Sequence, residues 1–69
     1  MAKTLIGSEE ALRFLRKEVT DSELKAQLKD AVEDAMTWGE AEVEIHESDI
    51  PKIQQALDVM EGHSIRWAG

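Results

Sequence analysis

The sequence predicts a small α+β fold in which two N-terminal helices pack on a strand–helix–strand unit (ααβαβ), with room for an extra N-terminal strand. Three observations support this fold. Apolar residues recur at helical spacing through most of residues 8–38, and they then alternate with acidic residues over 40–46. Helical spacing returns after residue 50. A chain of 69 residues is expected to form one domain, 1–69.

The first segment, residues 2–6, contains Leu5 and Ile6 and can form a short terminal strand. Ser8 is then placed to cap a helix, because two glutamates follow it directly and acidic side chains favour the positive end of the helix dipole. The apolar stripe of this helix contains Leu12, Leu15 and Val19, and Phe14 lies off that stripe and widens the apolar face.

A second helix is expected to begin at Thr20 or Asp21. Thr20 and Glu23 have the spacing of a capping box, and the apolar residues Val19 and Leu24 flank them as in a hydrophobic staple. Gly39 is expected to end this helix. Its predicted apolar stripe contains Leu24, Leu28, Ala31, Val32, Ala35 and Met36.

The second half of the chain predicts strand, helix and strand. Residues 40–46 alternate between acidic or polar and apolar side chains, which is typical of a half-buried strand. Ser48 or Asp49 is expected to cap a third helix with Pro51 in its first turn, and Gly62 to end it. The predicted buried stripe of that helix contains Ile50, Ile53, Leu57 and Met60.

Residues 64–67 predict a final short strand with Ile65 and Trp67 on one face. A strand–helix–strand crossover favours parallel strands. A two-stranded sheet is unstable alone, so we expect the two N-terminal helices to cover one of its faces.

From Leu24 to Trp67 the order is amphipathic helix, glycine, alternating strand, helix, glycine and short strand, with Gly39 and Gly62 as the two glycines. This order resembles short phage- or prophage-encoded proteins of the helix–strand–helix–strand kind. The resemblance implies a host-takeover factor or inhibitor. It transfers no functional residue to this chain.

The formal net charge of −7 is unevenly distributed. Residues 1–19 carry a net +1, residues 20–39 carry −3, and residues 40–69 carry −5. Nucleic acids and anionic membranes bind basic surfaces, so the sequence disfavours both as direct partners and favours a basic protein surface. The alternative is that the charge only keeps the protein soluble.

The candidate partner-binding residues are acidic side chains of the predicted strand and second helix, joined by one tryptophan near a helix end. They are Glu40, Glu42, Glu44, Glu47, Asp49, Asp30, Glu33, Asp34 and Trp38. Tryptophan is enriched at interface hot spots, and Trp38 lies near the margin of the helix stripe. The alternative for the acidic row is an ordinary solvated strand face, and Trp67 is expected to close the core.

Residues for catalysis or metal binding are not arranged in a recognisable pattern. The chain has no cysteine, and His46 and His63 lack the paired spacing of zinc ligands. The serines fall at predicted caps and turns, and there is no glycine-rich phosphate loop. We therefore expect no enzyme activity, no metal and no cofactor.

The expected location is the cytoplasm of the producer or of its host cell. No apolar run approaches the ~18–20 residues that span a bilayer. The first seven residues are too short and too polar for a secretory signal.

The leading hypothesis is a non-catalytic acidic binding module, in its most concrete form a phage-type, anti-CRISPR-like inhibitor that occupies a basic surface of a host nucleic-acid-binding protein. The alternative is a small self-associating structural or assembly protein. A short sheet without disulfides also favours a homodimer.

Overall fold

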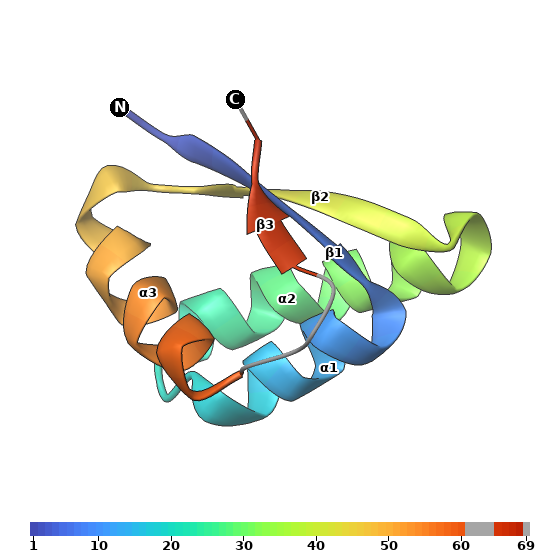
Figure 1. The fold of residues 1–69 in the computed structure, drawn as a ribbon, viewed down its shortest axis with the longest axis horizontal. Helices are drawn as coiled ribbons and strands as arrows, with labels where there is room; N and C mark the ends of the chain where they lie inside the picture. The colour runs from blue at the N-terminus through green and yellow to red at the C-terminus, as the bar shows by residue number, and fades with distance from the viewer. Residues whose placement is uncertain (61–64, 69) are drawn as a thin grey trace.

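The computed structural model describes residues 1–60 and 65–68 (Figure 1). The elements follow one another as β1 (Lys3–Ser8), α1 (Glu9–Glu18), α2 (Ser22–Trp38), β2 (Glu40–Ile45), the short 3₁₀ helix η1 (Glu47–Asp49), α3 (Ile50–Val59) and β3 (Ile65–Trp67). The chain therefore has the predicted small α+β fold, with the additional N-terminal strand present.

The N-terminal strand forms the centre of the sheet. The strand order among the described residues is β2-β1-β3, and β1 pairs antiparallel with both neighbours. The predicted crossover strands β2 and β3 consequently run in the same direction, but they are separated by β1 and do not pair with each other. Six residues of β1 pair with β2, so this strand is longer than the 2–6 segment that the sequence indicated.

The helices lie on one side of the sheet (Figure 1). Buried apolar residues from the strands and the helices form one core cluster. Leu5 of β1 is completely buried at the centre of the core. The strand β2 adds Ala41, Val43 and Ile45, as its alternation predicted. The helices contribute a buried set that contains Ala11, Leu12, Leu15, Leu24, Leu28, Ala31, Val32, Ala35, Ile53 and Ala56, and Met60 directly after α3 is also buried.

The short strand β3 closes one end of this core. Trp67 pairs with Leu5 across the sheet, so its side chain lies on the helix-covered face, where it is half-buried. Its indole Nε1 donates a hydrogen bond to Gln54 Oε1 at 3.3 Å, and Lys3 Nζ lies 5.9 Å from the ring centroid. Trp67 therefore packs as the sequence predicted.

Two of the predicted helix boundaries are confirmed. The Ser8 hydroxyl accepts a hydrogen bond from the Ala11 amide at 3.3 Å, which caps α1. Gly39 ends α2 in the left-handed conformation with φ 90°, and its amide donates to the Ala35 carbonyl. The predicted stop at Gly62 lies outside the described residues.

The predicted start of α2 at Thr20 or Asp21 is confirmed at Asp21, but the predicted capping box of Thr20 and Glu23 is wrong. Asp21, not Thr20, is the N-cap, and its carboxylate accepts hydrogen bonds from the amides of Glu23 and Leu24 at 2.9 and 3.1 Å. A carboxylate can accept both bonds and also favours the positive helix end, so it is the better cap here. The flanking residues Val19 and Leu24 are both buried.

Two further details correct the sequence analysis. The predicted apolar stripe of α2 includes Met36, but the Met36 side chain is 58% exposed and its sulfur lies 3.8 Å from Arg13 on α1. Neither Ser48 nor Asp49 caps α3 through its side chain, because the 3₁₀ helix precedes α3 and His46 Nδ1 accepts from the Ser48 amide instead. Pro51 does lie in the first turn of α3.

Candidate protein-binding surface

The sheet face opposite the helices is not covered by any described element. Side chains alternate along a strand between the two faces of the sheet. Leu5 and Val43 are buried against the helices, so the residues directly before and after them face the open side. We call this side the open sheet face. The open sheet face contains Thr4, Ile6, Ser8, Glu40, Glu42, Glu44 and Arg66. The three glutamates are exposed, as predicted, and alternate residues of one strand stand ~6.6–6.8 Å apart.

Charge on the open sheet face is divided between its two edges. The glutamates line the β2 edge, whereas Arg66 is exposed on β3 at the other edge. Ile6 lies between them, because it is paired with Glu42 on one side and with Arg66 on the other. The open sheet face is therefore acidic along β2 and basic at one point on β3.

The end of α2 adds two of the predicted residues to the acidic side. Asp34 and Trp38 are four residues apart on α2, so they lie on the same side of the helix. Together with Glu40 and Glu42 they line an open hollow of about 540 Å³. The Trp38 side chain is 80% exposed, which agrees with the sequence prediction. We call Asp34, Trp38, Glu40, Glu42 and Glu44 the acidic edge.

Four of the predicted site residues lie apart from the acidic edge or have other neighbours. Glu47 accepts a hydrogen bond from the amino group of Met1 at 2.6 Å. Asp49 forms an ion pair with Lys52 at 3.6 Å. Asp30 is exposed on α2, one turn before Asp34, and Glu33 faces a cluster of basic residues.

That basic cluster is a feature that the sequence analysis missed. Arg13, Arg16 and Lys17 of α1 and Lys29 of α2 line a groove of about 360 Å³ between the two helices, together with Val32 and Glu33. Four of the eight lysine and arginine residues are gathered there. The spacing of the three α1 residues was visible in the sequence, but the contribution of α2 depends on how the helices pack.

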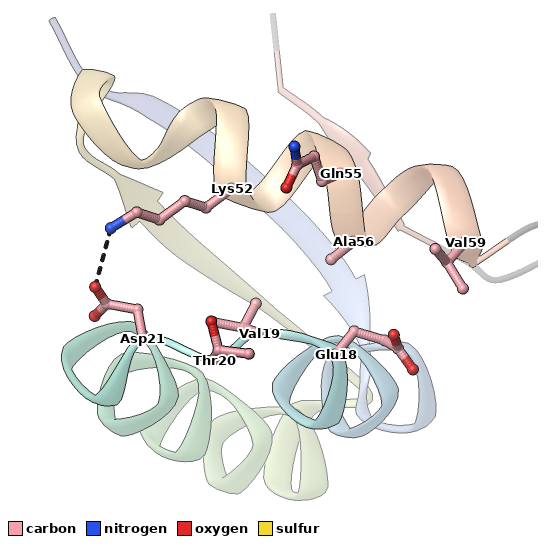
Figure 2. Close-up of a pocket in the computed structure, with 8 residues that line it drawn as sticks. All are labelled: Glu18, Val19, Thr20, Asp21, Lys52, Gln55, Ala56 and Val59. Atoms are coloured by element: carbon pink, nitrogen blue, oxygen red, sulfur yellow. Dashed lines mark hydrogen bonds and ion pairs between the residues drawn. The ribbon is translucent and has the colours of Figure 1, made fainter.

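A smaller groove of about 200 Å³ lies between the α1–α2 junction and α3 (Figure 2). Figure 2 shows Lys52 reaching from α3 toward Asp21, and Nζ lies 3.0 Å from Oδ2. The backbone hydrogen bond from Leu24 and the hydrogen bond from Lys52 lower the pKa of Asp21. The same pairing raises the pKa of Lys52. The two charged groups pair with each other at this groove.

Among residues 1–60 and 65–68, no group of three or more histidine or acidic side chains is placed to hold a metal ion. The helices in this part of the chain are also not long and apolar enough to cross a membrane. Comparison with protein-family models, curated proteins and solved structures gave no match to this chain.

Proposed function

We propose that the protein is a non-catalytic binding module whose acidic edge occupies a basic surface on another protein. The observation that supports this most directly is the outward orientation of Glu40, Glu42 and Glu44, which follows from the burial of the alternate residues of β2. No described lysine or arginine lies within ion-pair distance of these three carboxylates. Their charge remains available to a partner.

The magnitude of the repulsion inside this row is small. Two unit charges 4 Å apart in water interact by only about 1 kcal/mol, and the glutamates are farther apart than that. The folded chain therefore holds the row at little cost. Exposed charges of this kind act mainly on the rate of association and on its salt dependence, and they suppress contacts with other acidic surfaces.

The exposed Trp38 adds an apolar contact to the charges of the acidic edge. A tryptophan that is 80% exposed leaves a large apolar ring in water, and burial of such a ring in a contact is favourable. The ring lies beside Glu40 and Glu42 at the shared hollow, so an apolar anchor and two carboxylates can engage one partner surface together.

The most concrete form of the proposal is a phage-type, anti-CRISPR-like inhibitor that covers the basic surface of a host nucleic-acid-binding protein. The small size and the net charge of −7 support this form. Duplex DNA carries one charge per ~1.7 Å, several times more densely than a strand with alternate glutamates. Asp34 adds a further carboxylate beside the row, but the acidic edge remains sparser than DNA. We therefore propose that it blocks one basic patch and does not imitate a duplex.

A second candidate function is self-assembly, and the basic cluster between α1 and α2 supports it. A surface with four basic residues and an acidic edge on the same chain can pair head to tail between copies. A symmetric homodimer through the acidic edge is disfavoured, because it would place glutamates against glutamates.

The test compares the wild type with Glu40→Gln/Glu42→Gln/Glu44→Gln. A matched control, Glu10→Gln/Glu18→Gln/Glu23→Gln, removes the same charge from exposed helix positions. Proteins retained from host lysate on the wild type are purified, and binding kinetics are measured at about 50 and 500 mM salt. Competition with duplex DNA for the retained protein is measured in parallel.

We expect the β2 variant to associate more slowly and with a weaker salt dependence, and the control to behave as the wild type does. Equal kinetics for all three proteins would show that the acidic edge is not the binding surface. Sedimentation of the protein alone examines the second candidate: a single species of the monomer mass of 7.8 kDa across micromolar concentrations excludes self-assembly.

A further inference from the structure

We infer that the outer edge of β2 binds an extended, basic segment of the partner as an additional strand of the sheet. This inference rests on the proposed function and specifies how the partner is bound. It is based on the backbone of β2, on the charges that the same residues carry, and on the side chains at both ends of the edge.

The backbone of β2 has unpaired groups along its outer edge. The Ala68 amide donates to the Thr4 carbonyl at 2.8 Å, so the backbone groups of Thr4 point toward β3. Successive residues of a strand point to opposite sides, and Leu5 and Gly7 therefore bond to β2. Their partners there are Val43 and Ala41.

The intervening residues of β2, Glu42 and Glu44, must then direct their amide and carbonyl groups away from β1. No described residue pairs with them on that side, because β2 is the last strand of the sheet order. Unpaired backbone groups in a row along a strand edge are a template for another strand.

The residues with free backbone groups are also the residues with free carboxylates. Backbone groups lie in the plane of the sheet and side chains stand perpendicular to it, so Glu42 and Glu44 present both to an added strand. The side chains of such a strand would alternate in the same way. Lysine or arginine at every second position would lie opposite the glutamates, at the ~4.5–5.5 Å Cβ separation of cross-strand pairs.

The same charges select against other strands. A second copy of β2 paired antiparallel would bring glutamates opposite glutamates, and like charges in that position are destabilising. Charged residues on edge strands commonly prevent aggregation in this way. The three glutamates attract a strand with basic side chains by their charge. The inferred occupant of the edge is therefore a basic segment.

The surroundings of the edge leave room for such a segment. At the start of β2, the hollow beside Glu40 and Glu42 is bordered by Trp38, whose ring can also contact a lysine or arginine through a cation–π interaction. At its end, Glu44 and His46 border a second hollow of about 230 Å³ with Gln27 of α2. The edge is therefore open at both ends.

The test uses two synthetic peptides of about eight residues, the length of an ordinary strand. One alternates lysine and threonine, and the other has the same composition with all lysines in one block. Binding to the wild-type protein is measured at low salt by titration, and backbone amide exchange is followed by NMR. We expect the alternating peptide to bind at least about tenfold tighter, which corresponds to ~1.4 kcal/mol.

We also expect the alternating peptide to slow exchange of the Glu42 and Glu44 amides. The Ala41 and Val43 amides are internal controls, because they are bonded within the β1–β2 ladder before binding. Equal affinity for both peptides, without protection of the two glutamate amides, would overturn strand addition and leave the proposed function standing. If neither peptide binds the wild type more tightly than it binds the triple glutamine variant, that result would count against the proposed function itself.

Two protein variants separate the backbone from the charge. Glu42→Gln and Glu42→Pro both remove one carboxylate, but proline also removes the outward amide and places its ring at the edge, without breaking the bonds to β1. We expect Glu42→Pro to bind the alternating peptide at least about tenfold more weakly than Glu42→Gln does. Equal binding would contradict strand addition. If the proline variant does not fold, the amide exchange of the wild type decides the question.

The wild-type protein without peptide gives a further test. Protection of the Glu42 and Glu44 amides that appears in the protein alone, and rises with its concentration, would assign the edge to a second copy and overturn the inference.

Discussion

Asp21 and Lys52 connect the beginning of α2 to α3 through a single ion pair of 3.0 Å (Figure 2). The two carboxylate oxygens of Asp21 have different partners: Oδ1 accepts from the backbone at the start of α2, and Oδ2 contacts Lys52. One side chain therefore caps one helix and also contacts a neighbouring helix.

Replacement of Asp21 by alanine should lower the free energy of unfolding by ~0.5–2 kcal/mol, because the cap is lost. Asp21→Asn should destabilise the protein less than Asp21→Ala, because asparagine also caps helices. Any remaining loss reflects the ion pair with Lys52, which asparagine cannot form. Thr20→Ala is the matched control and should change stability by no more than ~0.5 kcal/mol, because Thr20 is exposed and is not the N-cap. Urea denaturation of the three variants measures these differences. A larger loss for Thr20→Ala than for Asp21→Ala would contradict the cap assignment.

The stabilisation from Asp21 should depend on pH in the acid range. Its pKa in the folded protein is lowered from 3.8, so its contribution is present above pH 3.8 and is lost as the pH falls through the lower, folded-state pKa. The pKa of Lys52 is raised from 10.5, so its contribution is lost only as the pH rises beyond that value. Between these limits both contributions are retained.

Urea denaturation of the wild type and Asp21→Asn from neutral pH to about pH 2 measures the acid limb. The difference in unfolding free energy between the two proteins should shrink as the pH falls below about 4. A difference that stays constant over this range would show that the Asp21 carboxylate does not have a lowered pKa.

The glutamate row should contribute little to folding. Replacing Glu40, Glu42 and Glu44 with glutamine should leave the melting temperature unchanged or slightly raise it, because the variant removes repulsion between like charges. Ile45→Ala should instead cost ~2–5 kcal/mol, because Ile45 is completely buried. Thermal melts followed by circular dichroism compare the two. A marked loss of stability in the glutamine variant would mean that the row has a structural role.

Gly39 should tolerate alanine poorly. Its φ of 90° lies in the left-handed region, which costs a residue with a Cβ roughly 1–2 kcal/mol. No atom lies within 4 Å of the place where a Cβ would be, so the cost comes from the backbone and not from a clash. Gly39→Asn should be less destabilising than Gly39→Ala, because asparagine enters this region more readily. Equal stability of both variants and the wild type would contradict this explanation.

Local sequence patterns predicted much of the fold. The alternation over residues 40–45 indicated both the strand and the outward direction of its glutamates, and Ser8 and Gly39 mark helix ends as expected. The apolar spacing of the helices also predicted most of the core. These features depend on residues that are close in the chain, so periodicity and capping chemistry are sufficient to find them.

Contacts between residues distant in the chain determined the strand order and the packing of the helices. The sequence left the N-terminal segment as an optional strand, whereas its pairing with both β2 and β3 makes it the centre of the sheet. Met36 stays exposed although it belongs to the predicted apolar stripe, and the packing of α1 against α2 gathers Lys29 with three basic residues of α1. Strand order and helix packing depend on which apolar faces bury each other. The residues on those faces are far apart in the chain, so the local spacing of apolar residues does not reveal which faces meet.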